Sequence, residues 1–488
     1  MRPGDAFSTA LMTDLYQLTM AYGYWKQGRA DQQTVFHLFF RRAPFGGRAA
    51  IAAGLEPALR LLESFHFREE DLVCLSQICG TTQKPLFEPG FIEYLRHLRL
   101  SVDVAAVAEG TLVFPHEPLL RIQGTILQCQ LLETALLNIL NFQTLIATKA
   151  ARIVRAAQGD SVLEFGLRRA QGPDGGLSAS RAAFIGGCAA TSNVLAGQQF
   201  GIPVKGTHAH SWVMAFDDEL AAFEAYAAAM PDNCVFLVDT WDTLQGVRNA
   251  IAVGRQLRRN GHQMIGVRLD SGDLLELSLQ ARRLLDDAGF ADAAIVASND
   301  LDEFSIRDLK QRGAAINVWG VGTRLVTGDQ QAALGGVYKL GAVRTESGEW
   351  QPKLKRSDQS VKTSIPGILQ VRRYRDSSGM AVGDMIHNLM QPPTASAQIV
   401  GFDGQRLLVP TDTNGGWQDL LQPVMTNGRI SEPLPSLTEI QHQTKQQLAE
   451  MPEQFLRLEA PEPFPAGIEE TLFQTRTHLA QSHGKEST

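Results

Sequence analysis

The sequence predicts an α/β protein whose central part is a closed barrel of parallel strands. From about residue 130 to 340, short Val-, Ile- and Leu-rich runs alternate with amphipathic helical segments, which is the pattern of repeated βα units. Nearly every apolar run ends in charged, hydroxyl or glycine residues, and in a βα barrel the carboxyl ends of the strands carry the chemistry. A doubly wound open sheet is the alternative, but it does not need polar residues at almost every strand end.

The central elements can be predicted in order from these patterns. A long buried helix spans residues 129–158, followed by a strand at 161–165 and a Gly-rich loop at 171–176. Ser178, just after this loop, is a candidate N-cap for an Ala-rich helix. The later strands, each followed by a helix except the last, are predicted at 204–207 (helix 217–229), 235–239 (243–259), 264–270 (274–288), 294–298 (303–312) and 316–321.

The two flanks of this central part have a different pattern. A helix at 13–25 precedes the strand-like runs, which lie at 34–40, 106–114, 367–374 and 397–402. We expect the flanks to pack together as one α+β domain beside the barrel. The predicted boundaries are 1–128 for the N-terminal domain, 129–340 for the barrel, 341–430 for the segment that packs with the N-terminal domain, and 431–488 for a helical or irregular tail.

Composition excludes several classes of function. The chain has 44% hydrophobic and 20% charged residues, a formal net charge of −7 and no long basic run, so nucleic acid is not an expected partner. Its five cysteines form no CxxC pair, which indicates reduced thiols in a cytoplasm. We expect no signal peptide and no membrane span, because the N-terminus lacks a basic region before an apolar stretch and no apolar run is long enough to cross a bilayer.

The most informative stretch is Pro-Val-Lys-Gly-Thr-His-Ala-His-Ser at residues 203–211, which sets His208 and His210 two residues apart at a predicted strand end. An imidazole at such a place is a candidate titratable or nucleophilic group. Spacing alone leaves the choice between the two histidines open, and a lone barrel histidine is more often a structural hydrogen-bonding residue.

Seven ordered motifs resemble the nicotinate phosphoribosyltransferase family. They lie at residues 11–20, 39–47, 164–174, 206–211, 267–273, 320–323 and 334–340. The resemblance implies an irregular TIM-like barrel of type II phosphoribosyltransferases with an N-terminal α+β domain completed by C-terminal segments, usually as a homodimer with shared active sites. It also implies an ATP-dependent ligase that makes nicotinate mononucleotide and pyrophosphate from nicotinate and phosphoribosyl pyrophosphate, with Mg²⁺, in NAD biosynthesis.

Candidate nicotinate-binding residues follow from the chemistry and from this resemblance. A planar guanidinium pairs bidentately with a carboxylate, and the family places an arginine at the position of Arg268; the alternative is a structural ion pair with a nearby aspartate. The family's stacking pair is matched by Phe165 and by Tyr16, which reaches in from the partner subunit; the alternatives are a core aromatic and an ordinary helix residue. Thr207, in the matched 206–211 motif, completes the set.

Phosphate groups prefer backbone N–H groups and hydroxyls. Gly320, Gly322 and Thr323 are therefore candidates for the ribose 5′-phosphate, although a GxGT stretch is more often an ordinary tight turn. Arg168 and Arg169, beside the Gly-rich loop, are candidates for pyrophosphate, with one of the two facing the site.

Carboxylates near the ribose stabilise positive charge at its C1 atom and bind Mg²⁺ through water. Asp239 and Asp270 end predicted strands and are assigned both roles. Helix N-capping is the alternative for both, and above all for Asp270 and Asp273, because a helix follows them at once. The family's phosphorylated histidine lies in a Gly-Thr-x-Ala-His-Ser pattern, which assigns this role to His210 rather than His208.

Two alternatives use the same fold. A nicotinamide phosphoribosyltransferase carries an aspartate that accepts a hydrogen bond from the amide, but residues 190–193 read Ala-Thr-Ser-Asn, so the absence of an acid favours nicotinate. A catalytically silent metabolite-binding protein would have lost His210, Arg268 or the Gly-Val-Gly-Thr stretch, and all are present.

Overall fold

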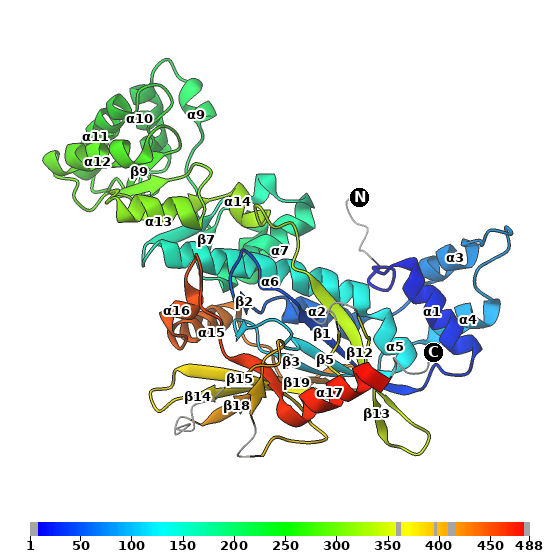
Figure 1. Cartoon of the computed structure of the whole chain (residues 1–488). Helices are drawn as coiled ribbons and strands as arrows, with labels where there is room; N and C mark the ends of the chain where they lie inside the picture. Colours follow the sequence, from blue (N-terminus) through cyan, green and yellow to red (C-terminus); the bar gives the residue numbers. More distant parts are fainter. Residues whose placement is uncertain (1–7, 358–362, 395–397, 408–415, 483–488) are drawn as a thin grey trace. The chain divides into compact units, whose positions relative to one another are not determined.

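The computed structural model describes residues 8–357, 363–394, 398–407 and 416–482. These residues form two compact units. We call residues 145–332 the central unit, and the described residues up to 144 and from 333 onward the flanking unit. Figure 1 shows the elements of both, coloured along the chain.

The central unit is built on a parallel sheet. Its six strands are β6 (Ser161–Glu164), β7 (Ala190–Thr191), β8 (Val235–Leu237), β9 (Gly266–Leu269), β10 (Ala294–Ala297) and β11 (Val318–Val321). They are hydrogen-bonded in the order β7-β6-β11-β10-β9-β8, and every neighbouring pair is parallel. The predicted parallel α/β arrangement is therefore confirmed.

Helices alternate with these strands. They are α6 (Glu133–Ala156), which contains the boundary between the units, α7 (Gly172–Ile185), α8 (Val194–Phe200), α9 (His210–Met214), α10 (Glu219–Ala229), α11 (Thr243–Arg259), α12 (Leu274–Asp287), α13 (Glu303–Gln311) and α14 (Thr323–Val326). Figure 1 shows α10, α11 and α12 packed side by side. Aspartate side chains accept backbone N–H groups at the starts of α10, α11, α12 and α13, and this places Asp273 as the N-cap of α12.

Three predictions for the central elements are wrong. The helix predicted at 129–158 is interrupted at Leu132, which separates α5 (Ile126–Leu131) from α6. Ser178 is not an N-cap, because α7 begins six residues earlier at Gly172, after Gln171; Pro173 in its first turn supplies the preorganised backbone that starts the helix. Residues 204–207 do not form a strand, because only Val204 makes a bridge, to Thr191.

A closed barrel is not shown by the hydrogen bonding of the described residues. The ladder ends at β7 and β8, which are not joined to each other. The physical reason lies in the segment that would close it: the Leu237 N–H on β8 donates to the ring of His208 at 3.2 Å rather than to a strand carbonyl. A backbone donor satisfied by a side chain cannot also extend a ladder.

Strands of the flanking unit come from both ends of the chain. The first part supplies β1 (Gln33–Phe40), β2 (Ala50–Ile51), β3 (Asp103–Val107), β4 (Leu112–Val113) and β5 (Leu120–Thr125). The second part supplies β12 (Gly336–Arg344), β13 (Trp350–Pro352), β14 (Leu369–Arg375), β15 (Ala381–Asn388), β16 (Ile399–Val400), β17 (Arg406–Leu407), β18 (Trp417–Asp419), β19 (Leu421–Thr426), β20 (Arg429–Ile430) and β21 (Ala466–Glu469).

Strands from the two parts of the chain pair with each other within the flanking unit. An antiparallel sheet in the order β13-β12-β1-β5-β3-β19-β20 pairs β1 with β12 and β3 with β19. A second, mixed sheet has the order β17-β16-β21-β15-β14-β18, and β2 pairs with β4. The helices are α1 (Leu15–Lys26), α2 (Leu55–Ser64), α3 (Glu69–Gln77), α4 (Pro89–His97), α5 (Ile126–Leu131), α15 (Leu437–Ala449), α16 (Glu453–Leu456) and α17 (Glu470–Ser482).

Three details of the flanks differ from the predictions. The single run predicted at 106–114 is split into β3 and β4, because the chain turns at Gly110, whose φ is +84°. The run predicted at 397–402 is reduced to β16, with Ala397 outside the described residues. The tail is helical as predicted but also contributes β21, which lies parallel to β15 inside a sheet.

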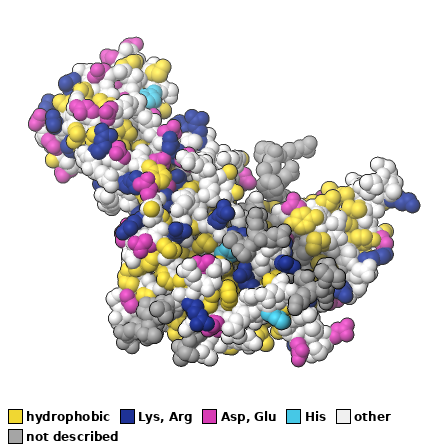
Figure 2. All heavy atoms as spheres, viewed as in Figure 1, with side chains coloured by type: hydrophobic (Ala, Val, Ile, Leu, Met, Phe, Trp, Pro, Cys, Tyr) yellow, Lys and Arg dark blue, Asp and Glu magenta, His cyan; other side chains and the backbone are white. Residues whose placement is uncertain are grey.

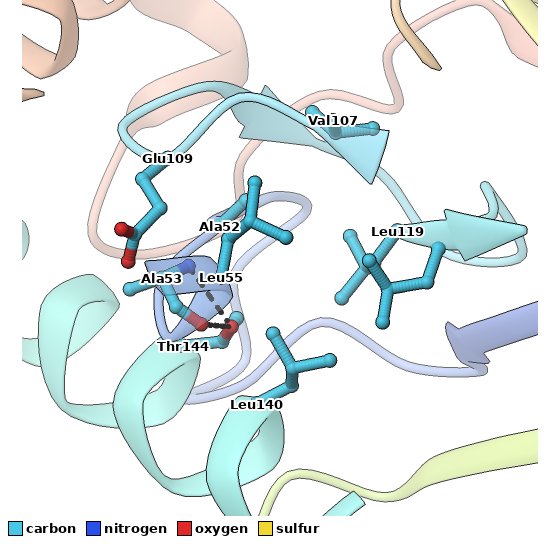
Figure 3. Close-up of a pocket in the computed structure, with 9 residues that line it drawn as sticks. Ala52, Ala53, Leu55, Val107, Glu109, Leu119, Leu140 and Thr144 are labelled. Atoms are coloured by element: carbon cyan, nitrogen blue, oxygen red, sulfur yellow. Dashed lines mark hydrogen bonds between the residues drawn. The ribbon is translucent and has the colours of Figure 1, made fainter. Parts of the chain in front are cut away.

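A small internal pocket of the flanking unit is structural. Its volume is about 10 Å³, the space of one water molecule. Figure 3 shows Glu109, Thr144 and apolar side chains around it. Glu109 accepts the Gly54 and Glu56 N–H groups at 2.6 and 3.3 Å, and the Thr144 hydroxyl lies 3.2 Å from the Ala53 N and O atoms. The carboxylate stabilises the N-terminus of α2.

Charge does not mark a binding face in the view of Figure 2. Over the described residues of that face, Lys and Arg side chains are mixed with Asp and Glu side chains rather than gathered by sign. None of the helices in the described part of the chain is both long and apolar enough to cross a membrane.

Candidate active site

A pocket of about 150 Å³ lies in the central unit, where strands β6, β9, β10 and β11 end. The carboxyl ends of parallel strands meet at one edge of a sheet, which is where such folds bind ligands. The pocket is lined by Phe165, Arg168, Arg169, Arg268, Asp270, Ser298, Asn299, Asp300, Gly320, Gly322 and Thr323. Most residues predicted for the site are thus brought together.

Arg268, on β9, is held in one orientation by three neighbours. Its Nε donates to Ser298 Oγ at 2.6 Å, Nη1 to Thr207 Oγ1 at 3.2 Å and Nη2 to Asp270 Oδ1 at 2.9 Å. The side chain is 15% exposed. Thr207, which was predicted for the nicotinate site, thus contacts Arg268, and the ion pair with Asp270 that was the alternative role of Arg268 is also present. An arginine locked in this way presents its remaining N–H groups to the pocket with little loss of conformational entropy on binding.

Phe165 follows β6 and supplies the aromatic wall of the pocket. The Arg268 guanidinium lies 5.9 Å from its ring centroid, within the range of a cation–π contact. Gly320 on β11 leaves room for this ring, because a Cβ atom there would lie 2.8 and 2.9 Å from the Phe165 Cδ2 and Cε2 atoms. Gly320 therefore acts by letting the ring lie against the strand, which is a different role from the phosphate contact predicted from the sequence.

Asp239 and Asp270 are connected through the backbone. Asp239 Oδ2 accepts the Asp270 N–H at 2.8 Å and the Ser271 hydroxyl at 2.7 Å. Asp239 Oδ1 is buried and has no hydrogen-bond partner among the described residues. Asp270 Oδ1 accepts from Arg268 and from Ser298 Oγ, the latter at 2.6 Å. Asp270 is thus no N-cap; its carboxylate is part of the pocket.

These carboxylates fit Mg²⁺ in one respect. The partnerless Oδ1 of Asp239 is a hard oxygen available to a cation, as the ion prefers. No group of three or more His, Cys, Asp or Glu residues able to hold a metal occurs within the described ranges. Two carboxylates at strand ends suit Mg²⁺, which binds proteins through one or two carboxylates and keeps waters and phosphate oxygens as its other ligands.

His210 is the more accessible of the two histidines in the 203–211 stretch. It begins α9, its side chain is 40% exposed, its Nδ1 lies 3.1 Å from Thr240 Oγ1, and its Nε2 lies 3.9 Å from Asp270 Oδ2. When Nδ1 carries the proton and donates to Thr240, Nε2 has a free lone pair beside the pocket. That is the arrangement a nucleophilic imidazole needs.

His208 is a structural residue. It is buried, and its Nε2 accepts the Leu237 N–H, so that nitrogen has no lone pair to offer. Burial, followed by the charges of Arg268 and His210, lowers the pKa of His208 to about 4. The ring packs among three aromatic side chains, Phe223, Tyr226 and Phe236. The hydrogen bonding of the two rings therefore favours His210 over His208 as the reactive histidine.

The buried neutral state of His208 predicts a pH dependence of stability. Its folded-state pKa of about 4 lies below the unfolded value near 6.5, so the unfolded chain binds more protons between these values. The contribution of neutral His208 to the free energy of unfolding is complete above pH 6.5. It is lost as the pH falls toward 4, at no more than about 1.4 kcal/mol per pH unit. His208→Gln keeps an acceptor for Leu237 and should flatten the fall, measured by urea unfolding at pH 7 and pH 5. An unchanged slope would contradict this.

The phosphate candidates line the same pocket. Arg168 and Arg169 lie in a 3₁₀ turn (Leu167–Arg169), are exposed, and have no acidic partner among the described residues. Gly322 is the N-cap of the short helix α14, and Thr323 is its first residue. Two unpaired guanidinium groups thus face the same cavity as this turn, which makes the pocket suited to anions.

Three residues that line the pocket were not assigned a role from the sequence, and four predicted residues are not part of its lining: Tyr16, Thr207, Asp239 and His210. Ser298, Asn299 and Asp300 follow β10 and line the pocket; their signal was the polar ending of that strand, but no role was assigned to them. Tyr16 lies on α1 in the flanking unit and is 48% exposed. It is not among the residues that line the cavity of the central unit.

Fold and pocket together define an α/β protein with an arginine-rich pocket, walled on one side by an aromatic ring, at the ends of parallel strands. Family models match along the chain: the N-terminal domain of nicotinate phosphoribosyltransferase at residues 11–141, the family itself at 161–385 and its C-terminal domain at 369–476. The chain belongs to the nicotinate phosphoribosyltransferase family.

Relatives support this along the whole chain. It is 43% identical to a nicotinate phosphoribosyltransferase of Bacillus subtilis, covering 96% of this chain and 94% of that one, and 37% identical to the human protein, covering 96% of each. The crystal structure of human nicotinic acid phosphoribosyltransferase aligns with a TM-score of 0.83 at 35% identity, over 96% of this chain and 100% of that one. A nicotinate-nucleotide pyrophosphorylase of Pyrococcus furiosus shares the fold, with a TM-score of 0.70 at 22% identity.

Proposed function

We propose that this protein makes nicotinate mononucleotide and pyrophosphate from nicotinate and phosphoribosyl pyrophosphate, on the route to NAD. The observation that carries the proposal is one pocket that combines an oriented arginine, an aromatic wall and two unpaired arginines. A carboxylate on an aromatic ring fits Arg268 and Phe165, while Arg168 and Arg169 fit pyrophosphate. The family membership supports the same assignment.

The reaction exchanges one bond at the ribose C1 atom. The C1–O bond to pyrophosphate breaks with its electron pair leaving on oxygen, and the pyridine nitrogen lone pair forms the new C1–N bond. Arg268 and Phe165 fix the ring so that its nitrogen faces C1, which removes the entropy cost of orientation. Asp270, whose Oδ2 is not engaged by Arg268, offsets positive charge on the ribose in the transition state.

The leaving group requires neutralisation of its charge. Arg168 and Arg169 supply two guanidinium groups, and Gly322 and Thr323 supply backbone N–H and hydroxyl donors for the ribose phosphate. Bound Mg²⁺ would neutralise pyrophosphate oxygens near Asp239 and Asp270. We also propose that the parallel strands belong to the irregular barrel of type II phosphoribosyltransferases.

A preference for nicotinate over nicotinamide tests this proposal. Replacing a charged bidentate contact by an amide in a desolvated site costs on the order of 2–4 kcal/mol, so kcat/KM should be about 30- to 900-fold lower with nicotinamide. Thr191 donates to Glu164, and Asn193 caps α8, so residues 190–193 offer no acidic acceptor for an amide. The measurement is product formation from each substrate with phosphoribosyl pyrophosphate and Mg²⁺. Equal efficiencies would support the nicotinamide enzyme, and no product from either would support a silent binding protein.

We further propose a homodimer in which Tyr16 completes the partner's site. Tyr16 is exposed on α1 and lies in the unit that does not contain the pocket. Mixing Tyr16→Ala with Arg268→Ala protein should then restore activity, because half of randomly formed dimers are mixed and one of their two sites is intact, giving up to roughly one quarter of wild-type activity. No recovery after demonstrated subunit exchange would contradict a shared site.

A further inference from the structure

Glu164 is a fully buried carboxylate directly behind the pocket. It is the last residue of β6, with 0% exposure. Successive side chains of a strand point to opposite faces, so Phe165 enters the pocket while Glu164 lies on the other side, against α7 and β7. It is absent from the pocket lining, and none of the roles above uses it.

Donors on three different segments satisfy this carboxylate. The Gly166 N–H donates to Oε1, and the hydroxyls of Ser180 on α7 and Thr191 on β7 lie 2.8 and 2.6 Å from Oε2. The Thr191 oxygen accepts the Asn193 N–H at 3.0 Å, so its own proton is directed to Glu164. A buried charge held by several donors strongly favours a single arrangement of the segments that supply them.

Gly166 connects this network to the residues that line the pocket. It lies between Phe165 and the turn that carries Arg168 and Arg169. A Cβ atom at Gly166 would lie 2.3 Å from Val326 Cγ1 and 3.0 Å from the Gly322 carbonyl oxygen, so its backbone packs directly on α14. The hydrogen bond from Gly166 to Glu164 therefore determines how the arginine turn lies against the Gly322 turn.

We propose that Glu164 is a positioning residue that, through Gly166, sets Phe165, Arg168 and Arg169 relative to the turn at Gly322 and so determines affinity for phosphoribosyl pyrophosphate. This inference rests on the proposed function of the pocket. It assigns Glu164 no contact with substrate.

Glutamine is the informative substitution because it keeps the shape. One oxygen becomes an NH₂ group, which must face either the Gly166 N–H or the two hydroxyls. Against Gly166 it places two donors together; against Thr191 it faces an oxygen that already accepts from Asn193. Either orientation loosens one of the three anchors while leaving the apolar core intact.

The matched control is Asp160→Asn. Asp160 immediately precedes the same strand and accepts from Lys310 Nζ at 2.7 Å and from Trp319 Nε1 at 3.0 Å, but it lies at the end of β6 remote from the pocket. Both variants lose a charge from a partly or fully buried hydrogen-bonded carboxylate. Only Glu164→Gln disturbs the arginine turn.

The experiment measures KM for each substrate, kcat and Tm for wild type, Glu164→Gln and Asp160→Asn, together with calorimetric titration of inorganic pyrophosphate with Mg²⁺. We expect Glu164→Gln to raise KM for phosphoribosyl pyrophosphate and Kd for pyrophosphate by about tenfold, with a smaller change in kcat. Asp160→Asn should lower Tm and leave both constants unchanged. Thr191→Val, which lacks the hydroxyl, should raise the same two constants by a smaller factor than Glu164→Gln. Thr191→Ser keeps the hydroxyl and should have the wild-type values.

The inference is wrong if folded Glu164→Gln protein has the wild-type KM for phosphoribosyl pyrophosphate and the wild-type Kd for pyrophosphate. It is also wrong if these two constants rise equally in the Asp160→Asn protein. If Glu164→Gln does not fold, the KM for phosphoribosyl pyrophosphate and the Kd for pyrophosphate of Thr191→Val and Thr191→Ser test the inference instead. A wild type without transferase activity refutes the proposed function instead, and the pyrophosphate titration of the variants still tests the positioning role.

Discussion

Arg268→Ala should lower kcat/KM for nicotinate by about 30- to 900-fold, because the function proposed above gives Arg268 a charge-assisted bidentate contact with the substrate carboxylate, worth on the order of 2–4 kcal/mol. The side chain is only 15% exposed and held by Thr207, Asp270 and Ser298. Such a preorganised guanidinium cannot be replaced by water, which is mobile and uncharged. The loss should fall mainly on KM for nicotinate and much less on KM for phosphoribosyl pyrophosphate, measured by initial rates with one substrate varied at a time.

A second arginine of the same unit provides the control. Arg282, on α12, pairs with Asp286 and donates to the carbonyls of Ala293 and Phe290, so Arg282→Ala should affect stability but not substrate preference. Arg268→Lys keeps the charge without the planar fork and should recover only part of the activity. Wild-type nicotinate efficiency in Arg268→Ala would show that another group binds the carboxylate.

Periodicity was sufficient to predict most central elements. The helix expected at 243–259 is α11 with the same limits, because its apolar residues recur at helical spacing and Asp242 caps its first turn. The strand predicted at 204–207 does not form, and the periodicity of the sequence cannot show why. Whether an extended segment becomes a strand depends on a neighbour's free backbone groups, and the Leu237 N–H is occupied by His208.

The site was predicted through the rule that chemistry gathers at strand ends. That rule correctly grouped Phe165, Arg268 and Asp270 around one cavity. It could not distinguish His210 from His208, because exposure and hydrogen bonding depend on residues about thirty positions away, such as Thr240 and Leu237. Glu164 was also missed, since one residue of difference along a strand places a side chain on the opposite face.

The role of His210 can be tested independently of the pyridine substrate. We propose that ATP hydrolysis is coupled to nucleotide synthesis through phosphorylation of this residue. Nε2 would attack the γ-phosphorus of ATP, the bond to the β,γ-bridging oxygen would break, and ADP would leave with the electron pair. The added negative charge on the ring, 3.9 Å from Asp270 before modification, would then alter the electrostatics of the pocket.

His210→Ala should therefore lose ATP hydrolysis by on the order of 10²-fold or more and lose all stimulation of synthesis by ATP, while a slow uncoupled transfer remains. His208→Gln is the control: its ring nitrogen is occupied by Leu237 and its pKa is lowered to about 4, so it should affect stability more than coupling. The measurement is acid-labile phosphate retained from γ-labelled ATP, compared with ADP release. Wild-type labelling of the His210→Ala protein would show that another residue carries the phosphoryl group. The exposed ring of His210 and its free Nε2 would then have no part in the coupling.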